Sequence, residues 1–284
     1  MPDASSPDLA NRQPSAEAPQ APRRWAEWCY RLTPALPLVF LIGTPSLFIT
    51  RYLYKLQSPD QFVGTSPSIS GTASHPPSGD FFKWTMLAVA ICIVIAWPLN
   101  LIMQWRTTDT YTPLGMRRWP IKAAQVAAAA LGVVAAFFLV ALSFVSLGQN
   151  HDAHILYSIL FYVIQVLAIV TETMSCVWLR RRTPILAARP APASLRRRVP
   201  AASVVAAISL LFLYLYVVRD SLPPQVLYPV QLFYVFIEYT VAVLCFAYPF
   251  TGFVEIRRYF AALSGRTSPA ITAAAYLHSA EDTV

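Results

Sequence analysis

The chain has 284 residues, of which 56% are hydrophobic and 13% charged, and its mean hydropathy is +0.48. Soluble domains carry about 25% charged residues, so the composition excludes an ordinary soluble globular protein and favours burial in a bilayer. The net charge is +8, but lysine and arginine occur in short blocks between long uncharged runs. A nucleic-acid-binding domain gathers them on one face, so no nucleic acid partner is expected.

The two ends of the chain differ from its middle. Residues 1–24 are rich in Pro, Ala, Ser and Asp and contain no apolar run, which predicts a disordered tail rather than a secretory signal. Residues 259–284 are predicted to form a second, mobile tail. Between them, residues 25–258 are predicted to form one transmembrane domain.

Six apolar runs in this middle region are long enough to cross a bilayer, which takes about 20 residues of helix. The fold class is therefore predicted to be all-α, a polytopic membrane helix bundle of six transmembrane helices. The first run contains Pro34, Pro37 and Pro45, which membrane helices tolerate because neighbouring groups satisfy the freed carbonyls. A re-entrant form of this run remains an alternative. The six runs are residues 32–50, 84–103, 123–147, 155–179, 201–218 and 226–250.

The basic residues are distributed unequally between the two sides of such a bundle. Of the 22 lysines and arginines, 18 fall on the side that holds both tails. The other side has only Arg51, Lys55, Lys83 and Arg219. Because basic loops resist translocation, both termini are predicted to be cytosolic. The luminal side then has one sizeable polar segment, residues 51–82, as the place where a substrate headgroup would be recognised.

The strongest basic patch lies between the fourth and fifth runs, from Arg180 to Arg198. One interpretation is a determinant of topology. The other is contact with anionic lipids of the cytosolic leaflet, where each basic residue near the surface contributes about 1 kcal/mol. The two interpretations are compatible.

Histidines and an acid gather at the luminal start of the fourth run. Asp152 lies between His151 and His154, and the spacing of three places both imidazoles on one helix face. The carboxylate could orient one ring and raise its basicity. The alternative is an ordinary helix start in which Asn150 or Asp152 is the N-cap. A metal site would need a third ligand such as His75, and no metal is predicted.

Two acids lie inside predicted spans, Glu172 in the fourth and Glu238 in the sixth. Burying such a group costs roughly 2.5–3.5 kcal/mol on insertion scales, so each needs a partner or a water-filled cavity. Since no basic residue lies within the predicted spans, Asn100 and tyrosine hydroxyls are the expected partners. The alternatives are hydrogen bonding between helices and a lipid or catalytic site.

Other features are less informative. Arg219, which closes the fifth run beside Asp220, suits a phosphate or serves as an interfacial anchor. The four cysteines show no metal-ligand spacing and are interpreted as small apolar residues. The common nucleotide, hydrolase and metalloprotease motifs are absent from the sequence, and no cofactor is predicted.

Four short motifs, taken together, resemble the FRAG/DRAM/Sfk superfamily of six-span membrane proteins. They are SPSIS at residues 66–70, His151-Asp152, Arg219, and FIEYTVAVL at residues 236–244. The Glu-Tyr-Thr-Val run is most similar to the branch of the post-GPI-attachment-to-proteins factor 2. The sequence departs from the family pattern at Gly64, where Asn is common, and at Asp220, where His is common.

This resemblance implies lipid remodelling of GPI anchors in the Golgi apparatus or endoplasmic reticulum, as a transferase or as a helper of one. His151 and Asp152 would then be the catalytic pair. The expected partners are membrane lipids, above all the lipid or headgroup of the GPI anchor. Sister branches imply an alternative, a non-enzymatic regulator of lipid asymmetry, phosphoinositide kinase recruitment or autophagy. A transporter fits less well, because no internal repeat is evident. The implied substrate-binding residues are Ser66, Pro67, Ser68, Ser70, His154, Arg219, Glu238 and Tyr239.

Overall fold

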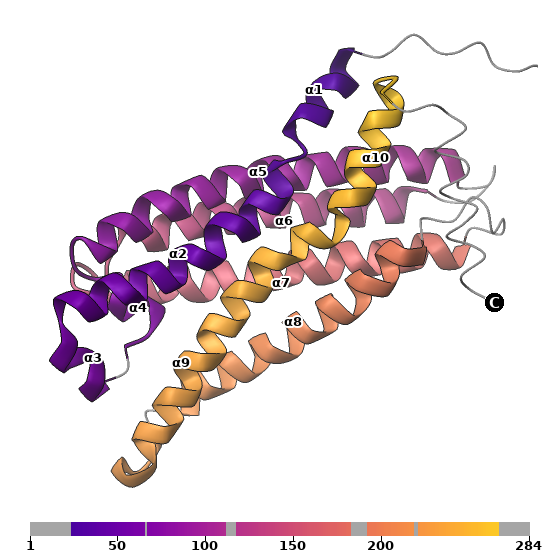
Figure 1. Ribbon diagram of the computed structural model, residues 1–284. Helices are drawn as coiled ribbons and strands as arrows, with labels where there is room; N and C mark the ends of the chain where they lie inside the picture. The colour runs from indigo at the N-terminus through magenta and orange to yellow at the C-terminus, as the bar shows by residue number, and fades with distance from the viewer. Residues whose placement is uncertain (1–23, 66, 112–117, 183–191, 219–220, 267–284) are drawn as a thin grey trace, which may run out of the picture.

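The computed structural model describes residues 24–65, 67–111, 118–182, 192–218 and 221–266, and every regular element in these ranges is helical. Six stretches are long and apolar enough to cross a membrane, which confirms the prediction of an all-α, six-span membrane bundle (Figure 1). The elements are α1 (Arg24–Leu32), α2 (Ala35–Gln57), α3 (Pro59–Thr65), α4 (Ile69–Thr72), α5 (Ser78–Tyr111), α6 (Trp119–Phe144), α7 (His151–Arg182), α8 (Pro192–Val218), α9 (Pro224–Ala247), η3 (Tyr248–Gly252) and α10 (Phe253–Leu263).

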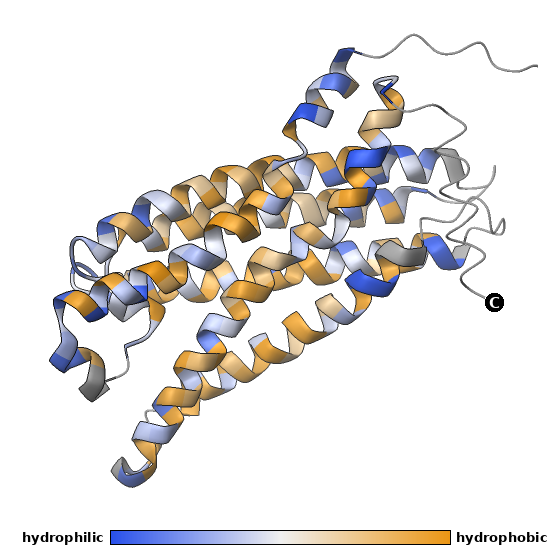
Figure 2. Ribbon diagram, in the orientation of Figure 1, coloured by the Kyte–Doolittle hydropathy of each residue, from blue (hydrophilic) through white to orange (hydrophobic). Residues whose placement is uncertain are grey.

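The spanning helices are longer than the apolar layer that they would cross. Helix α5 has 34 residues and α7 has 32, so each is about 50 Å long, against a hydrocarbon thickness of about 30 Å. Figure 2 shows apolar residues along the middle of the helices and hydrophilic residues gathered toward their ends. Pro45 lies inside α2, which is one continuous helix of 23 residues rather than a re-entrant segment.

The spanning helices follow one another around the bundle in chain order. Each of α2, α5, α6, α7 and α8 packs against the next spanning helix, and α9 returns to pack against α2. Small residues allow two of these contacts to be close. A Cβ on Gly43 of α2 would lie 2.6 Å from the ring of Phe246 in α9, and a Cβ on Gly132 of α6 would collide with the indole of Trp97 in α5.

Both ends of the described chain lie at the same end of the bundle, which we call the terminal end. There Trp25 of α1 packs edge-on against Phe260 of α10, with ring centroids 6.2 Å apart. Arg266 Nη2 also lies 2.5 Å from Glu27 Oε1. Helices α3 and α4 lie at the opposite end (Figure 1), which we call the loop end.

Two segments expected to be loops are largely helical. Residues 51–82 continue α2 to Gln57 and then form α3, α4 and the start of α5. Within residues 180–200, α7 extends to Arg182 and α8 begins at Pro192. The basic residues 196–198 therefore belong to a helix. Most of the two predicted tails, residues 1–23 and 267–284, lies outside the described residues.

Candidate functional site

Three segments that are distant in sequence meet at the loop end of the bundle. They are the PSIS residues at the start of α4, the first turns of α7 and the middle of α9. Together with Phe212 and Tyr216 of α8, their side chains surround a cavity of about 140 Å³ that has both polar groups and an aromatic wall. It is lined by Ser68, Ser70, Leu147, His151, His154, Ile155, Ser158, Ile159, Tyr162, Phe212, Tyr216, Tyr234 and Glu238.

His154 connects α7 to the PSIS segment. Its side chain is buried, and both ring nitrogens have partners. Nδ1 lies 2.5 Å from the carbonyl oxygen of Val145. Because a carbonyl can only accept, Nδ1 carries the proton. In the neutral ring Nε2 is then an acceptor, and the hydroxyl of Ser70 at 2.8 Å donates to it.

Glu238 connects α9 to the same segment. Its Oε2 accepts a hydrogen bond of 3.0 Å from the backbone N–H of Ile69, and the contact is buried. Glu238 also lines a second void of about 20 Å³ in the centre of the bundle, together with Ser70, Ser158 and Tyr162, which belong to both cavities. The carboxylate therefore lies between the polar cavity and the apolar bundle centre.

The rest of the PSIS segment is held in place by its neighbours. Arg51 Nη1 donates to the carbonyl oxygen of Pro67 at 2.8 Å. Ser68 is the N-cap of α4, and its hydroxyl accepts from the N–H of Gly71 at 3.1 Å. The guanidinium of Arg51 also lies 5.4 Å from the ring centroid of Tyr239. Tyr239 therefore faces α2, and it is not among the residues that line the cavity.

The predicted catalytic pair lies at the rim of the cavity. His151 Nδ1 is 3.3 Å from Asp152 Oδ1, and the two side chains are 66% and 102% exposed. His151 and His154 both line the cavity, as expected from their helical spacing. Asn150 is the N-cap of α7, since its Oδ1 accepts from the N–H of Ala153 at 3.1 Å, so the helix-start interpretation is confirmed at Asn150.

Some predicted site residues are not placed. Ser66, Arg219 and Asp220 lie outside the described residues. His75 packs near Tyr54, with ring centroids 6.2 Å apart. Within the described part of the chain, no group of three or more His, Cys, Asp or Glu side chains could hold a metal ion.

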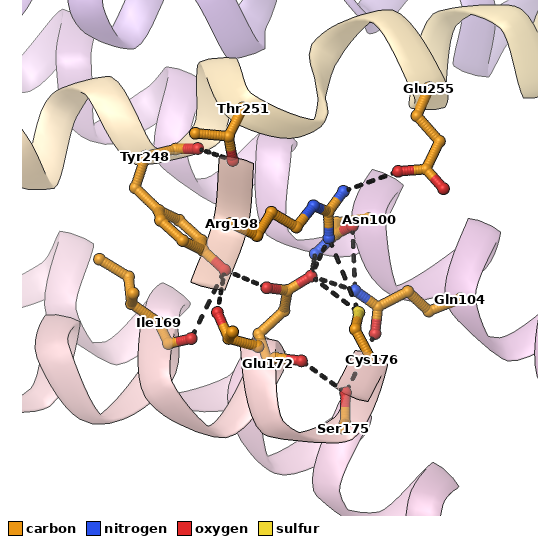
Figure 3. A network of polar contacts seen from close by, with 11 residues as sticks. Asn100, Gln104, Ile169, Glu172, Ser175, Cys176, Arg198, Tyr248, Thr251 and Glu255 are labelled. Carbon is orange, nitrogen blue, oxygen red and sulfur yellow. Dashed lines mark hydrogen bonds and ion pairs between the residues drawn. The ribbon is translucent and has the colours of Figure 1, made fainter. Parts of the chain in front are cut away.

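A second polar cluster surrounds Glu172 in the half of the bundle nearer the terminal end (Figure 3). The predicted partners, Asn100 and a tyrosine hydroxyl, are confirmed for Glu172, but the prediction that Glu172 has no basic partner is wrong. Arg198 forms a buried ion pair with it, and the two side chains are 4% and 1% exposed. Arg198 lies in α8 and not in the predicted loop, and its side chain points into the bundle instead of toward lipid headgroups.

Side chains from three other helical segments, α5, α8 and η3, donate to the Glu172 carboxylate. Asn100 Nδ2 of α5 donates at 3.1 Å, and Arg198 Nη2 reaches on to Glu255 of α10 at 3.3 Å. The two voids lined by Arg198 measure about 20 Å³ each, which is room for about one water molecule. This cluster therefore matches the alternative of hydrogen bonding between helices. The other donors to Glu172 are Arg198 Nη1, Gln104 Nε2 and Tyr248 Oη.

Several of these residues were not predicted from the sequence, although the spacing of some of them indicates a shared helix face. Gln104 lies four residues after Asn100, hence on the same face of α5, and could have been found. Arg51 is one of four basic residues predicted on the luminal side, and nothing else in the sequence marks it as a site residue. Arg198 gave no signal as a buried residue, because its position beside other arginines is typical of a loop. The aromatic wall of the cavity, Tyr162, Phe212, Tyr216 and Tyr234, is indistinguishable in sequence from ordinary membrane helix.

One protein-family model matches most of the chain. Residues 33–259 match the family model described as the Frag1/DRAM/Sfk1/Cwh43P N-terminal domain. No curated protein and no solved structure matches the chain. The matched residues run from the start of α2 into α10 and include the loop-end cavity and the Glu172 cluster.

Proposed function

The chain belongs to the Frag1/DRAM/Sfk1/Cwh43P family of multi-pass membrane proteins, and on that premise we propose that it remodels the lipid of GPI anchors. The site of action is the loop-end cavity, placed on the luminal side of the Golgi or endoplasmic reticulum membrane. The partners are the GPI-anchor lipid and its headgroup. The terminal end of the bundle, with both termini, faces the cytosol.

One observation carries the proposal, the meeting of Ser70, His154 and Glu238 at a single cavity. Ser70 and His154 are 84 residues apart in sequence, and Ile69 and Glu238 are 169 apart. A lipid headgroup needs a few placed polar groups, and the attached chain needs an apolar wall. The cavity offers both, since the side chains of Ser70, His154 and Glu238 face the rings of α7, α8 and α9.

Glu238 tests this proposal most directly. In cells that lack a GPI-remodelling factor, the wild-type chain should restore surface retention of a GPI-anchored reporter, measured by flow cytometry. Glu238→Ala removes the acceptor for the Ile69 N–H and should lower retention to the level of the deficient cells. Glu238→Gln keeps an acceptor oxygen and should fall between the two.

The matched control is Asp80→Asn, an acid at the same end of the bundle whose side chain is 58% exposed. This variant should retain wild-type activity. Retention at the wild-type level by a correctly folded Glu238→Ala protein would reject the loop-end site. Failure of the wild-type chain to restore retention, despite its presence in the Golgi, would reject anchor remodelling altogether.

A second candidate function, a non-enzymatic regulator that binds anionic lipid, is favoured by a different place in the structure. A groove of about 540 Å³ lies between α7 and α8 at the terminal end. Three arginines and three apolar residues line the groove. This combination suits a lipid phosphate with its acyl chains attached. The groove is lined by Val177, Arg180, Arg181, Leu195, Arg196 and Val199.

The arginines of this groove can be tested as a set that spares Arg198. Changing Arg180, Arg181 and Arg196 together to Gln should reduce co-purification of anionic phospholipid, measured by native mass spectrometry from nanodiscs. The matched control changes three exposed arginines of the same end that do not line the groove, Arg197, Arg257 and Arg258. If the groove set abolishes function while Glu238→Ala leaves it intact, the regulator replaces the remodelling proposal. Orientation must be checked in both sets, because fewer basic residues can invert a bundle.

A further inference from the structure

Ser70 and His154 have the geometry of a nucleophile and its base. The hydroxyl oxygen of Ser70 lies 2.8 Å from Nε2 of His154, and the other ring nitrogen is held by the Val145 carbonyl at 2.5 Å. An activated serine needs a base within hydrogen-bond reach and a third group that orients the base. Here a backbone carbonyl takes the orienting part that a carboxylate takes in the Ser-His-Asp arrangement.

The position of Ser70 gives a substrate access to its hydroxyl. Its side chain is half-buried and lines both the 140 Å³ cavity and the central void. His154, by contrast, is only 2% exposed, so bulk water is kept from the base. An acyl chain would lie against the apolar residues that line the same spaces, such as Phe161 and Phe212.

The backbone around Ser70 is fixed on both sides. Before it, Arg51 donates to the Pro67 carbonyl, and the N–H of Ile69 donates to Glu238. After it, the N–H of Gly71 is capped by Ser68. Such support from surrounding groups holds a reactive atom within the narrow range of positions that chemistry requires. Glu238 is a positioning residue in this arrangement.

The rim pair lacks these properties. His151 and Asp152 are 66% and 102% exposed, and an exposed pair gains little from its mutual interaction.

We propose that Ser70 is the acyl-accepting nucleophile of this protein, that His154 is its general base, and that the acyl donor is a lipid ester. This rests on the proposed function in lipid remodelling, for which it supplies the chemical step.

The reaction balances without a co-reactant. The Ser70 oxygen attacks the carbonyl carbon of the lipid ester while His154 Nε2 takes the hydroxyl proton. The new oxygen–carbon bond forms, the ester carbon–oxygen bond breaks, and His154 gives the proton to the departing lipid oxygen, which becomes a hydroxyl. In the second half, a hydroxyl of the acceptor lipid attacks the acyl-serine carbonyl, and the proton returns through His154 to Ser70.

A serine-directed fluorophosphonate probe tests the nucleophile independently of the GPI pathway. The purified full-length protein in nanodiscs should be modified at Ser70, as identified by mass spectrometry of its peptides. Ser70→Ala should remove the signal. His154→Gln should slow labelling by about 100-fold or more, the usual range for loss of a general base. The matched control is Ser143→Ala, because Ser143 is a buried serine whose hydroxyl bonds only its own helix at Leu139, and it should label like the wild type.

The outcomes separate this inference from the proposed function. No labelling of the folded wild-type protein, or labelling at another serine instead, overturns the nucleophile. If, in addition, the Ser70→Ala variant restores reporter retention, the proposed function in anchor remodelling is kept and the Ser70 nucleophile is rejected. Labelling at Ser70 in a protein that never restores retention supports the nucleophile and rejects the GPI anchor as substrate. Because the wild-type labelling position decides the matter, a Ser70→Ala protein that fails to fold does not block the test.

Discussion

Arg198 and Glu172 are charged side chains that water hardly reaches, with exposed fractions of 4% and 1%. Removing two ions from water costs several kcal/mol for each, and only good pairing with further hydrogen bonds offsets that cost. Here Asn100, Gln104 and Tyr248 complete the shell around Glu172, and Glu255 takes the other end of Arg198. The pair is thus compensated only while every partner is present.

Truncating one member should therefore be severe. Glu172→Ala leaves the Arg198 charge buried without its main partner and should destabilise the protein by about 3–5 kcal/mol, measured by thermal unfolding in detergent. Arg197→Gln changes the neighbouring exposed arginine and should stay within about 0.5 kcal/mol of wild type. Equal, small effects of both variants would mean that the Glu172–Arg198 pair does not stabilise the bundle.

At the scale of elements, the bundle closes where α9 meets α2. Gly43 permits this approach, because the Cβ of any other residue at this position would lie 2.6 Å from the Phe246 ring. Phe246 is fully buried and lines the central void. The contact therefore sets how closely the last span approaches the first, and with it the position of Glu238 two turns earlier on α9.

Gly43→Ala should overpack this contact and cost about 1–3 kcal/mol, seen as a lower melting temperature. Phe246→Leu in the same chain should recover part of the loss by making room. The control is Gly148→Ala, where an added Cβ would meet no atom within 4 Å. A stable Gly43→Ala protein with unchanged melting temperature would show that α2 and α9 are not in tight contact there.

Sequence patterns predicted the elements better than their ends. Apolar length alone located six spans, because a bilayer requires it. The start of α8 was misplaced, since charged residues are expected outside a span and the partner that admits Arg198 lies on another helix. The meeting of Ser70, His154 and Glu238 could be inferred only from a resemblance of motifs. The aromatic cavity wall depends on packing, which periodicity does not report.

At the scale of the whole molecule, the two polar clusters lie in opposite halves of the bundle and share the last span. Glu238 contacts the PSIS segment at the loop end, and Tyr248 contacts Glu172 toward the terminal end. Ten residues of helix separate them, about 15 Å along the axis. Since α9 and η3 follow one another without a break, an axial shift of this span would disturb both clusters at once.

The orientation of the bundle can be tested directly. Epitope tags on both ends of the chain should be cleaved by protease added outside intact Golgi-derived vesicles, because the termini are proposed to be cytosolic. A tag inserted after Ser74, in the turn between α4 and α5, should be protected until detergent opens the vesicles. Protection of the terminal tags together with exposure of the inserted one would invert the bundle and place the loop-end cavity in the cytosol.

The ion pair between α7 and α8 also bears on how the chain is made. Glu172 and Arg198 are 26 residues apart, so the ribosome releases the acid first and the base soon after. A lone arginine in a span is costly to insert, and so is a lone glutamate, but each removes the other's penalty once both have emerged. The pair therefore favours entry of α7 and α8 into the membrane together, as a helical hairpin, during synthesis. A chain that loses either residue should therefore insert less efficiently, so that less of it reaches the folded bundle.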